Sequence, residues 1–321
     1  MLKWGILSSA NITKRFIPRL LKSPRSQVTA IASRSIEKAE SVAKEWGIPK
    51  AYGSYEELLT DSEINVVYVP LPHALHAEWA VRAAESGKHC MVEKPIATKI
   101  SDVERMQRVA MENKVLIVEG FVHLCHPQFK AIQETIKSGV IGDVQFMTGS
   151  YVGGVSKRTD GSLWLLGCYP VSMMIGLLNE KPRRVTAMEC KTERGVDGSL
   201  YGILQFNNGI HGCITSSITS SSDSHFEING SKGRIRIHTN SAYHPDAYGV
   251  DNLFDLCIEG QPMKTITVPK IDAFLAEIAA FESSILDGKP TPVPLEHSHQ
   301  VVSTILALYA SAKRQGIVIT L

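Results

Sequence analysis

The stretch that decides the fold is His89-Cys90-Met91-Val92-Glu93-Lys94-Pro95. Its first four residues are typical of a short buried strand, which ends at a glutamate, a lysine and a proline. Ligands of open α/β sheets bind outside the carboxyl ends of the strands. A lysine held at this place by a proline is therefore a candidate for chemistry. A surface lysine at a strand end is the alternative interpretation of Lys94.

Strand-like and helix-like stretches alternate on both sides of this segment. The helix-like stretches carry apolar residues at helical spacing, and Ser35 and Ser54 stand where they would cap two of them. Strands that alternate with helices predict right-handed βαβ units and a parallel sheet. We therefore expect an α/β Rossmann domain over residues 1–119 that binds a dinucleotide. The other strand-like runs are Lys3–Leu7, Val28–Ala32, Val66–Val69 and Val115–Val118.

The pattern changes after about residue 120 to alternating, strand-rich sequence. Asn207-Asn208-Gly209 and Gly230-Ser231-Lys232-Gly233 are turn signals between strands, and two helix-like stretches close the chain. This predicts an α+β domain over residues 120–321, with helices on one face of an open, largely antiparallel sheet. The other sheet face is a candidate interface for a homodimer or a higher homo-oligomer.

Composition is that of an ordinary globular protein and excludes several classes. The 321 residues are 44% hydrophobic and 21% charged, and a net charge of +2 gives no field that favours nucleic acid or a membrane surface. No stretch approaches the ~18 apolar residues of a membrane span. The 6 cysteines have no C-x-x-C spacing and suggest reduced thiols of a cytoplasmic protein. The group His123, Cys125 and His126 fits no zinc pattern, so we expect no metal.

The loop after the first strand, Ser8-Ser9-Ala10-Asn11-Ile12, stands where a dinucleotide turn is expected. The fingerprint G-x-G-x-x-G is absent. Small residues would still let a pyrophosphate approach the backbone and the amides of the next helix. The alternative is a small-residue turn of no special function.

The second strand ends in Ser33-Arg34-Ser35. Folds that prefer NAD usually carry a carboxylate here to bind the ribose hydroxyls. A guanidinium and two hydroxyls suit a 2′-phosphate instead. We expect NADP(H), with NAD(H) as the second choice and a solvated surface arginine as the alternative.

Another strand, Val66–Val69, leads into Pro70-Leu71-Pro72-His73, with His76 three residues on. Two prolines would stiffen this loop at a carboxyl strand end, beneath a bound nicotinamide ribose. Ordinary loop and helix-start histidines are the alternative interpretation.

Together these elements resemble the glucose–fructose oxidoreductase / inositol dehydrogenase (Gfo/Idh/MocA) family, in order and spacing over nearly the whole chain. The most specific match is Glu93-Lys94-Pro95. The other matching segments are Gly5-Ile6-Leu7-Ser8-Ser9-Ala10-Asn11-Ile12, Ala32-Ser33-Arg34-Ser35-Ile36-Glu37-Lys38-Ala39, Pro70-Leu71-Pro72-His73, Glu119-Gly120-Phe121, His126-Pro127-Gln128, Gly167-Cys168-Tyr169-Pro170 and Gly230-Ser231-Lys232-Gly233-Arg234.

The resemblance implies an NAD(P)-dependent enzyme with a Rossmann domain, a substrate domain on an open sheet, and sugars, polyols or related diols as substrates. The family's catalytic lysine corresponds to Lys94, beside the cofactor residue Glu93, and its acid/base corresponds to Tyr169. A phenol with a pKa near ~10 is a poor base at neutral pH. An ammonium nearby would stabilise the phenolate. A core tyrosine is the alternative for Tyr169.

Three departures from the family pattern stand near the expected substrate site. Leu165 takes the place of the family's aspartate, Leu124 that of an arginine, and His73 that of an asparagine. An apolar site does not select for a hydroxyl. We therefore expect a less hydroxylated substrate near Trp164 and Leu165, and we expect His126 to lie in the substrate cleft or at the domain junction. Two rival functions follow from the same scaffold: a dinucleotide-binding sensor without turnover, and a lyase or epimerase that recycles its nicotinamide.

Overall fold

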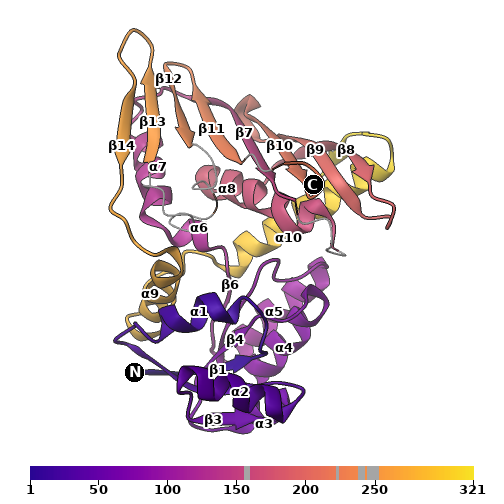
Figure 1. Ribbon diagram of the computed structural model, residues 1–321. Helices are drawn as coiled ribbons and strands as arrows, with labels where there is room; N and C mark the ends of the chain where they lie inside the picture. Colours follow the sequence, from indigo (N-terminus) through magenta and orange to yellow (C-terminus); the bar gives the residue numbers. More distant parts are fainter. Residues whose placement is uncertain (155–159, 222–223, 238–242, 244–252) are drawn as a thin grey trace. The chain divides into compact units, whose positions relative to one another are not determined.

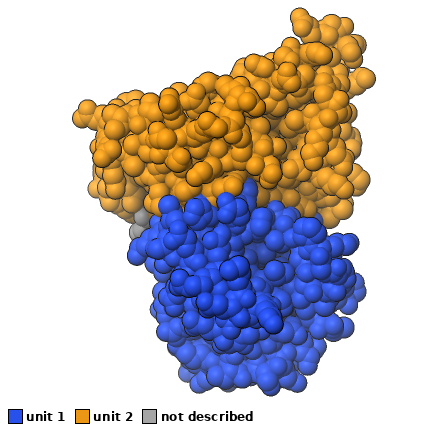
Figure 2. All heavy atoms as spheres, turned by 180° about the vertical axis from the view of Figure 1, so that it is seen from behind, with its two compact units in different colours: residues 1–121, 274–299 blue, residues 122–273, 300–321 orange. Residues whose placement is uncertain are grey.

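The computed structural model (Figure 1) describes residues 1–154, 160–221, 224–237, 243 and 253–321. It divides into two compact units, which Figure 2 distinguishes by colour: unit 1 holds residues 1–121 and 274–299, and unit 2 holds residues 122–273 and 300–321. The functional division expected at residue 119 stays a prediction. In the described part of the chain, no helix combines the length and the apolar character needed to cross a membrane.

Unit 1 is built on a 6-stranded sheet in the order β3-β2-β1-β4-β5-β6, whose neighbouring strands run parallel. This strand order and the helical crossovers are those of a dinucleotide-binding Rossmann domain, so the α/β prediction is confirmed. The elements are β1 (Leu2–Leu7), α1 (Thr13–Leu20), β2 (Ser26–Ala32), α2 (Ile36–Trp46), β3 (Lys50–Tyr52), α3 (Tyr55–Thr60), β4 (Val66–Val69), α4 (His73–Glu85), β5 (His89–Val92), α5 (Ile100–Glu112) and β6 (Ile117–Glu119).

The core of unit 1 joins the sheet to α1 and to most of a late helix, α9 (Ala273–Leu286). Phe16 of α1 stacks on Tyr68 of β4 with ring centroids 3.8 Å apart, and Trp4 of β1 meets Phe281 of α9 edge-on at 5.7 Å. Buried Glu282 of α9 accepts hydrogen bonds from the hydroxyls of Ser23 and Ser26, each at 2.5 Å. These hydrogen bonds attach helix α9 to the N-terminal end of β2.

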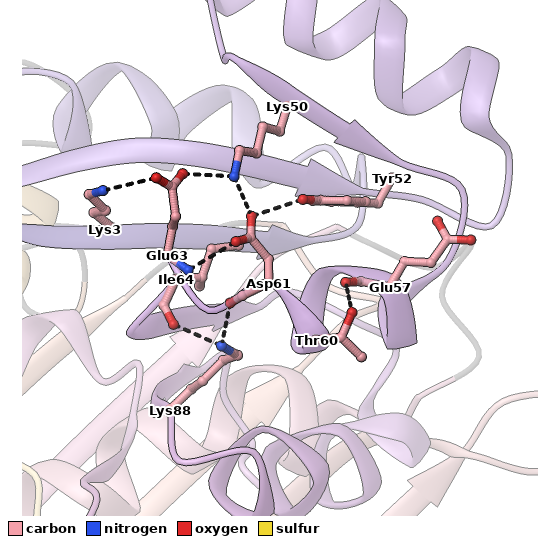
Figure 3. A network of polar contacts seen from close by, with 9 residues as sticks. All are labelled: Lys3, Lys50, Tyr52, Glu57, Thr60, Asp61, Glu63, Ile64 and Lys88. Carbon is pink, nitrogen blue, oxygen red and sulfur yellow. Dashed lines mark hydrogen bonds and ion pairs between the residues drawn. The ribbon is translucent and has the colours of Figure 1, made fainter.

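A polar network fixes the loop between α3 and β4 (Figure 3). Lys50 donates to Asp61 at 2.8 Å and to Glu63 at 2.7 Å, and the Tyr52 hydroxyl donates to Asp61 at 2.8 Å. The ammonium of buried Lys88 donates to the carbonyl oxygens of Asp61 and Ile64, both at 2.8 Å. Burial raises the pKa of Asp61, but the hydrogen bonds it accepts outweigh burial and hold that pKa at about 2.

Unit 2 is built on a 9-stranded sheet in the order β14-β13-β12-β11-β7-β10-β9-β8-β15. Among the described strands β7 and β10 pair in parallel and the other neighbours pair antiparallel, which confirms the open, largely antiparallel sheet. The elements are α6 (Val122–Cys125), α7 (Pro127–Lys137), β7 (Val144–Val152), the π-helix η1 (Leu163–Gly167), α8 (Cys168–Leu178), β8 (Arg184–Lys191), β9 (Asp197–Gln205), the 3₁₀ turn η2 (Asn207–Gly209), β10 (His211–Ser217), β11 (His225–Gly230), β12 (Gly233–Ile237), β13 (Leu253–Ile258), β14 (Lys264–Thr267), most of α10 (Leu295–Lys313) and β15 (Ile319–Thr320).

The two faces of this sheet differ. On one face, glycines of the strands leave room for helices: a Cβ at Gly149 would lie 2.7 Å from Pro170 of α8, and one at Gly202 would lie 2.9 Å from Leu308 of α10. Figure 1 shows α8 against the sheet. The opposite face carries exposed apolar side chains, namely Phe146, Met188, Tyr201 and Ile203.

Candidate active site

The predicted cofactor residues of unit 1 follow the carboxyl ends of its parallel strands. Since these strands run in one direction, their ends share one edge of the sheet, and Ser8, Ser33, Pro70 and Glu93 come directly after β1, β2, β4 and β5. The order changes direction between β1 and β4, which is where open α/β sheets bind ligands.

The turn after β1 uses a serine in a backbone conformation that favours glycine. Ser8 has a φ of 124° and donates its N–H to the Ala32 carbonyl at 2.9 Å, which ties the end of β1 to the end of β2. Ser9 and Ala10 are half-buried and Asn11 is exposed, and α1 begins two residues later at Thr13. Thr13 donates its hydroxyl to the Ala10 carbonyl at 2.7 Å, so the turn is closed against the helix start that Ile12 precedes.

At the end of β2 an exposed guanidinium stands beside two hydroxyl groups. Ser33 is buried and donates its N–H to the Tyr52 carbonyl at 3.1 Å, Arg34 is exposed, and Ser35 caps α2 by accepting from the Lys38 N–H. Burial raises the pKa of Tyr55, while the Arg34 guanidinium and a hydrogen bond to Ser8 lower it. Ser8, Arg34 and Tyr55 therefore gather at one place. No local pattern in the sequence indicated Tyr55.

The loop after β4 is tied to the Lys94-Pro95 turn by His76. Its imidazole is fully buried, with Nδ1 2.8 Å from the Pro95 carbonyl oxygen and Nε2 2.6 Å from the Leu71 carbonyl oxygen. His73 starts α4, and its ring centroid lies 5.7 Å from that of His76. His76 therefore contacts the loops at the ends of β4 and β5 through both ring nitrogens.

Lys94 is half-buried among carboxyl groups. Glu93 accepts a hydrogen bond from the Tyr68 hydroxyl at 2.7 Å, and buried Glu119 accepts one from the Ile96 N–H at 2.9 Å. Burial raises the pKa of Glu119 to about 7, although hydrogen bonds and the Lys94 charge pull it down. Burial also raises the pKa of Glu277 from α9, and the Glu93 charge adds to the effect. The sequence match included Glu119 but assigned it no role, and Glu277 carried no signal.

In unit 2, Tyr169 lies in a cluster of aromatic rings at the start of α8. The phenol ring is 3% exposed, and its centroid lies 5.3 Å from His123, 5.2 Å from Tyr151 and 6.0 Å from Tyr243. Tyr151 and Tyr243 stack on each other at 5.0 Å. These rings come from α6, β7 and residue 243, so their proximity depends on tertiary contacts that sequence spacing does not reveal.

The other predicted substrate residues of unit 2 have distinct surroundings. Leu165 is buried, and Trp164 is half-buried with its ring 6.1 Å from that of Tyr309. His126 is buried and caps α7: its Nδ1 accepts from the Gln128 N–H at 3.1 Å, and its Nε2 lies 3.1 Å from the Ile271 carbonyl oxygen. Within the described residues there is no group of three or more His, Cys, Asp or Glu side chains suited to a metal ion.

The structure thus brings together the predicted cofactor residues within unit 1, and Trp164, Leu165 and Tyr169 along one helical segment of unit 2. Lys94 belongs to unit 1 and Tyr169 to unit 2. Their convergence on one substrate stays a prediction.

Comparison with known proteins gives two family matches and relatives that are similar over most of the chain. Residues 2–121 match the model described as "Oxidoreductase family, NAD-binding Rossmann fold", and residues 129–236 match the GFO/IDH/MocA C-terminal domain. A D-xylose 1-dehydrogenase (NADP(+)) of Haloferax volcanii is 31% identical, with 97% of each chain covered. A trans-1,2-dihydrobenzene-1,2-diol dehydrogenase of Xenopus tropicalis is 33% identical, over 81% of this chain and 83% of its own.

Among solved structures, a 3-ketoreductase from Actinomadura kijaniata in complex with NADP and TDP-benzene is similar with a TM-score of 0.88. It is 28% identical, and 97% of each chain is covered. The similarity therefore extends over both units and is not confined to the nucleotide-binding sheet.

Proposed function

This chain belongs to the Gfo/Idh/MocA family of oxidoreductases, and we propose that it is an NADP(H)-dependent member that transfers hydride between nicotinamide and a carbinol or carbonyl carbon of a sugar-like or diol substrate. The family matches confirm the resemblance indicated by the sequence motifs. The observation that carries the proposal is Lys94 at the carboxyl end of β5, on the sheet edge where the predicted cofactor residues gather.

The preference for NADP(H) rests on the end of β2. Ser33-Arg34-Ser35 offers an exposed guanidinium and hydroxyls and no carboxylate, which fits a 2′-phosphate better than two ribose hydroxyls. Arg34 and the backbone and side chain of Ser8 would hold the phosphates. Tyr55 hydrogen-bonds Ser8 and interacts electrostatically with Arg34, so it would help to fix both. The NADP named for the Haloferax relative and present in the Actinomadura structure agrees with this choice.

Proton transfer is assigned to Lys94 and Tyr169. Bound NADP(H) would accept or supply the hydride. The Tyr169 hydroxyl would take up or donate the proton of the substrate oxygen, and the Lys94 ammonium would hydrogen-bond the same oxygen and stabilise the phenolate. Glu93 and Glu119, on the ends of β5 and β6, fix the backbone around Lys94 through Tyr68 and Ile96.

The substrate is expected to be less hydroxylated than a hexose or an inositol. Buried Leu165 stands where the family carries an aspartate, and an apolar surface gives no preference for a hydroxyl. Deoxysugar derivatives and apolar diols or ketones are the classes that we propose. The sugar and diol substrates in the names of the relatives belong to the same broad chemistry.

We also propose a homodimer or higher homo-oligomer in the cytoplasm. The face of the unit 2 sheet opposite α8 exposes Phe146, Met188, Tyr201 and Ile203, with Met188 66% exposed. Several large apolar side chains exposed on one sheet face are typical of an interaction site. A second copy of the same sheet face would cover them.

The test begins with fluorescence titrations of NADPH and NADH, followed by a panel of carbonyl compounds offered with the tighter cofactor. We expect tighter binding of NADPH and its oxidation by deoxysugar or apolar carbonyls. Tyr169→Phe should lower kcat about 10²–10⁴-fold while the affinity for NADPH is retained. The matched control is Tyr52→Phe, whose hydroxyl donates to Asp61 in the α3–β4 loop and which should leave kcat unchanged. An undiminished kcat in Tyr169→Phe would mean that another group moves the proton.

A dinucleotide-binding sensor is the second candidate, and Leu165 is the observation that favours it. A sensor would bind NADPH and turn over none of the carbonyl or carbinol compounds. Sustained NADPH oxidation with any member of the panel removes this alternative.

A further inference from the structure

A buried carboxylate lies under the start of the helix that carries Tyr169. Asp197, the first residue of β9, is 3% exposed. Its Oδ2 accepts hydrogen bonds from the Ser162 hydroxyl and the Leu163 N–H, and its Oδ1 accepts one from the Tyr309 hydroxyl, all at 2.8 Å. No sequence motif indicates this residue, because its partners are distant along the chain.

We propose that Asp197 is a positioning residue for Tyr169, which fixes the start of the helical segment Leu163–Leu178 and thereby the place of the phenol. The proposal rests on the proposed function, in which Tyr169 transfers the substrate proton.

The first observation is that Asp197 caps the helical segment from a neighbouring strand. A carboxylate that accepts the first helical N–H satisfies a donor that lacks an intrahelical partner, and its charge is favourable at the positive end of a helix. Hydrogen bonds to an ionised acceptor are also stronger than those between neutral groups. Leu163 N–H and the hydroxyl of Ser162, the residue just before the helix, both point to this carboxylate.

The second observation is that the backbone around the cap is pressed against the sheet. A Cβ at Gly161 would lie 1.6 Å from Asp197 Oδ1, and a Cβ at Gly167 would lie 3.1 Å from Ser216 of β10. The Ser162 and Ser216 hydroxyls are 2.9 Å apart. The π-helical turn between Gly161 and Tyr169 is therefore packed at both of its ends, and Asp197 fixes the end at which it begins.

The third observation is that the segment carries the predicted substrate residues. Trp164, Leu165 and Tyr169 all follow the cap within two turns, and Tyr309, bound to the same carboxylate, lies 6.1 Å ring to ring from Trp164. Burial raises the pKa of Tyr309, and the Asp197 charge raises it further, so its hydroxyl stays a donor. Because both Asp197 oxygens accept hydrogen bonds from protein groups, Asp197 does not replace the family's aspartate at position 165.

The test compares two variants of the cap with a matched control. Asp197→Asn removes the negative charge and places an amide NH₂ group against one of the groups that donate to Asp197. Ser162→Ala removes the donor hydroxyl of Ser162 without a change of charge. The control is Ser199→Ala, on the same strand, where a buried hydroxyl donates to Ser217 at 2.8 Å and has no part in the cap. We expect kcat to fall about 10- to 100-fold in Asp197→Asn and less in Ser162→Ala, with an unchanged KM for NADPH. Ser199→Ala should keep the wild-type kcat.

A second readout needs no substrate. Tyrosine isotope-labelled at Cζ gives an NMR signal for each phenol, and Tyr169→Phe identifies that of Tyr169. We expect this signal to move in Ser162→Ala and in Asp197→Asn and to stay in place in Ser199→Ala. If Asp197→Asn fails to fold, Ser162→Ala carries the test.

The outcomes separate the inference from the proposed function. Wild-type kcat and an unmoved Tyr169 signal in folded Ser162→Ala and Asp197→Asn would overturn the positioning role while turnover by the wild type keeps the function. A moved signal together with no turnover by the wild type would support the positioning role and overturn the function.

Discussion

Arg34 is the residue on which the choice between NADP(H) and NAD(H) depends. We predict that Arg34→Ala lowers the affinity for NADPH about 10- to 100-fold, because a charge-assisted hydrogen bond to a phosphate is lost. The affinity for NADH should stay nearly unchanged. Fluorescence titration of both cofactors measures the difference. Lys38→Ala, an exposed cation on the next helix, is the control. An equal loss of affinity for NADPH and NADH in Arg34→Ala would contradict the assignment.

Among the individual site residues, those that directly follow a strand could be predicted from the sequence. Those that tertiary packing brings to the site could not. Lys94 and Arg34 stand at strand ends, which hydrophobic patterning locates. Tyr55, Glu277 and Tyr151 reach the predicted sites from separate elements, and their own neighbours in sequence give no indication of it. Ser35, a predicted cofactor residue, also caps α2.

At the scale of elements, the α3–β4 loop depends on the ionisation of Asp61. Its pKa is 3.8 in the unfolded reference and about 2 in the folded protein. Between these values the unfolded state binds more protons, so the stability contributed by Asp61 is complete above 3.8 and is lost as the pH falls toward about 2. We predict that Asp61→Asn reduces the dependence of the free energy of unfolding on pH in this window.

Urea unfolding of the wild type and Asp61→Asn from neutral to acidic pH measures the effect. Asp102→Asn, on the first turn of α5, controls for the loss of one negative charge. Parallel stability profiles for the wild type and Asp61→Asn would contradict the prediction.

Helix α9 depends on Glu282 for its place in unit 1. Because the Glu282 carboxylate accepts hydrogen bonds from two buried hydroxyl groups, Glu282→Gln should lower the free energy of unfolding by about 1–3 kcal/mol. The control is Asp287→Asn in the same region, which breaks the exposed pair with Arg25 and should have little effect. Denaturant unfolding measures the free energy of unfolding of both variants. An equal decrease in the two would show that Glu282 has no special part in the packing of α9.

The sequence predicts helix starts and hairpin turns where local hydrogen bonding or a turn sequence specifies them. Ser35 and Ser54 accept the expected hydrogen bonds from the N–H groups of Lys38 and Glu57. Asn207–Gly209 forms the turn that connects β9 to the antiparallel β10. The packing of residues 274–299 with the first 121 residues has no such local cause. It depends on Phe281 meeting Trp4 and on Glu282 meeting Ser23 and Ser26, contacts across most of the chain.

For the whole molecule, the exposed sheet face predicts self-association. Ile203→Glu would place a charge in the centre of an apolar interface, and we expect it to yield a folded monomer by size-exclusion chromatography with light scattering. The control is Met111→Glu at a position on α5 that is 77% exposed, which should keep the assembly of the wild type. A wild-type monomer, or an unchanged assembly in Ile203→Glu, would contradict the predicted interface.

The central claim is that an ammonium from one unit and a phenol from the other act on one substrate oxygen. The most direct measurement is a crystal structure of the protein with NADP and a turned-over carbonyl or carbinol compound. We predict Lys94 Nζ and Tyr169 Oη each about 3 Å from that oxygen, beside the nicotinamide ring. A complex in which the two side chains lie on opposite sides of the molecule, or in which protein atoms fill the place of the ring, would contradict the account.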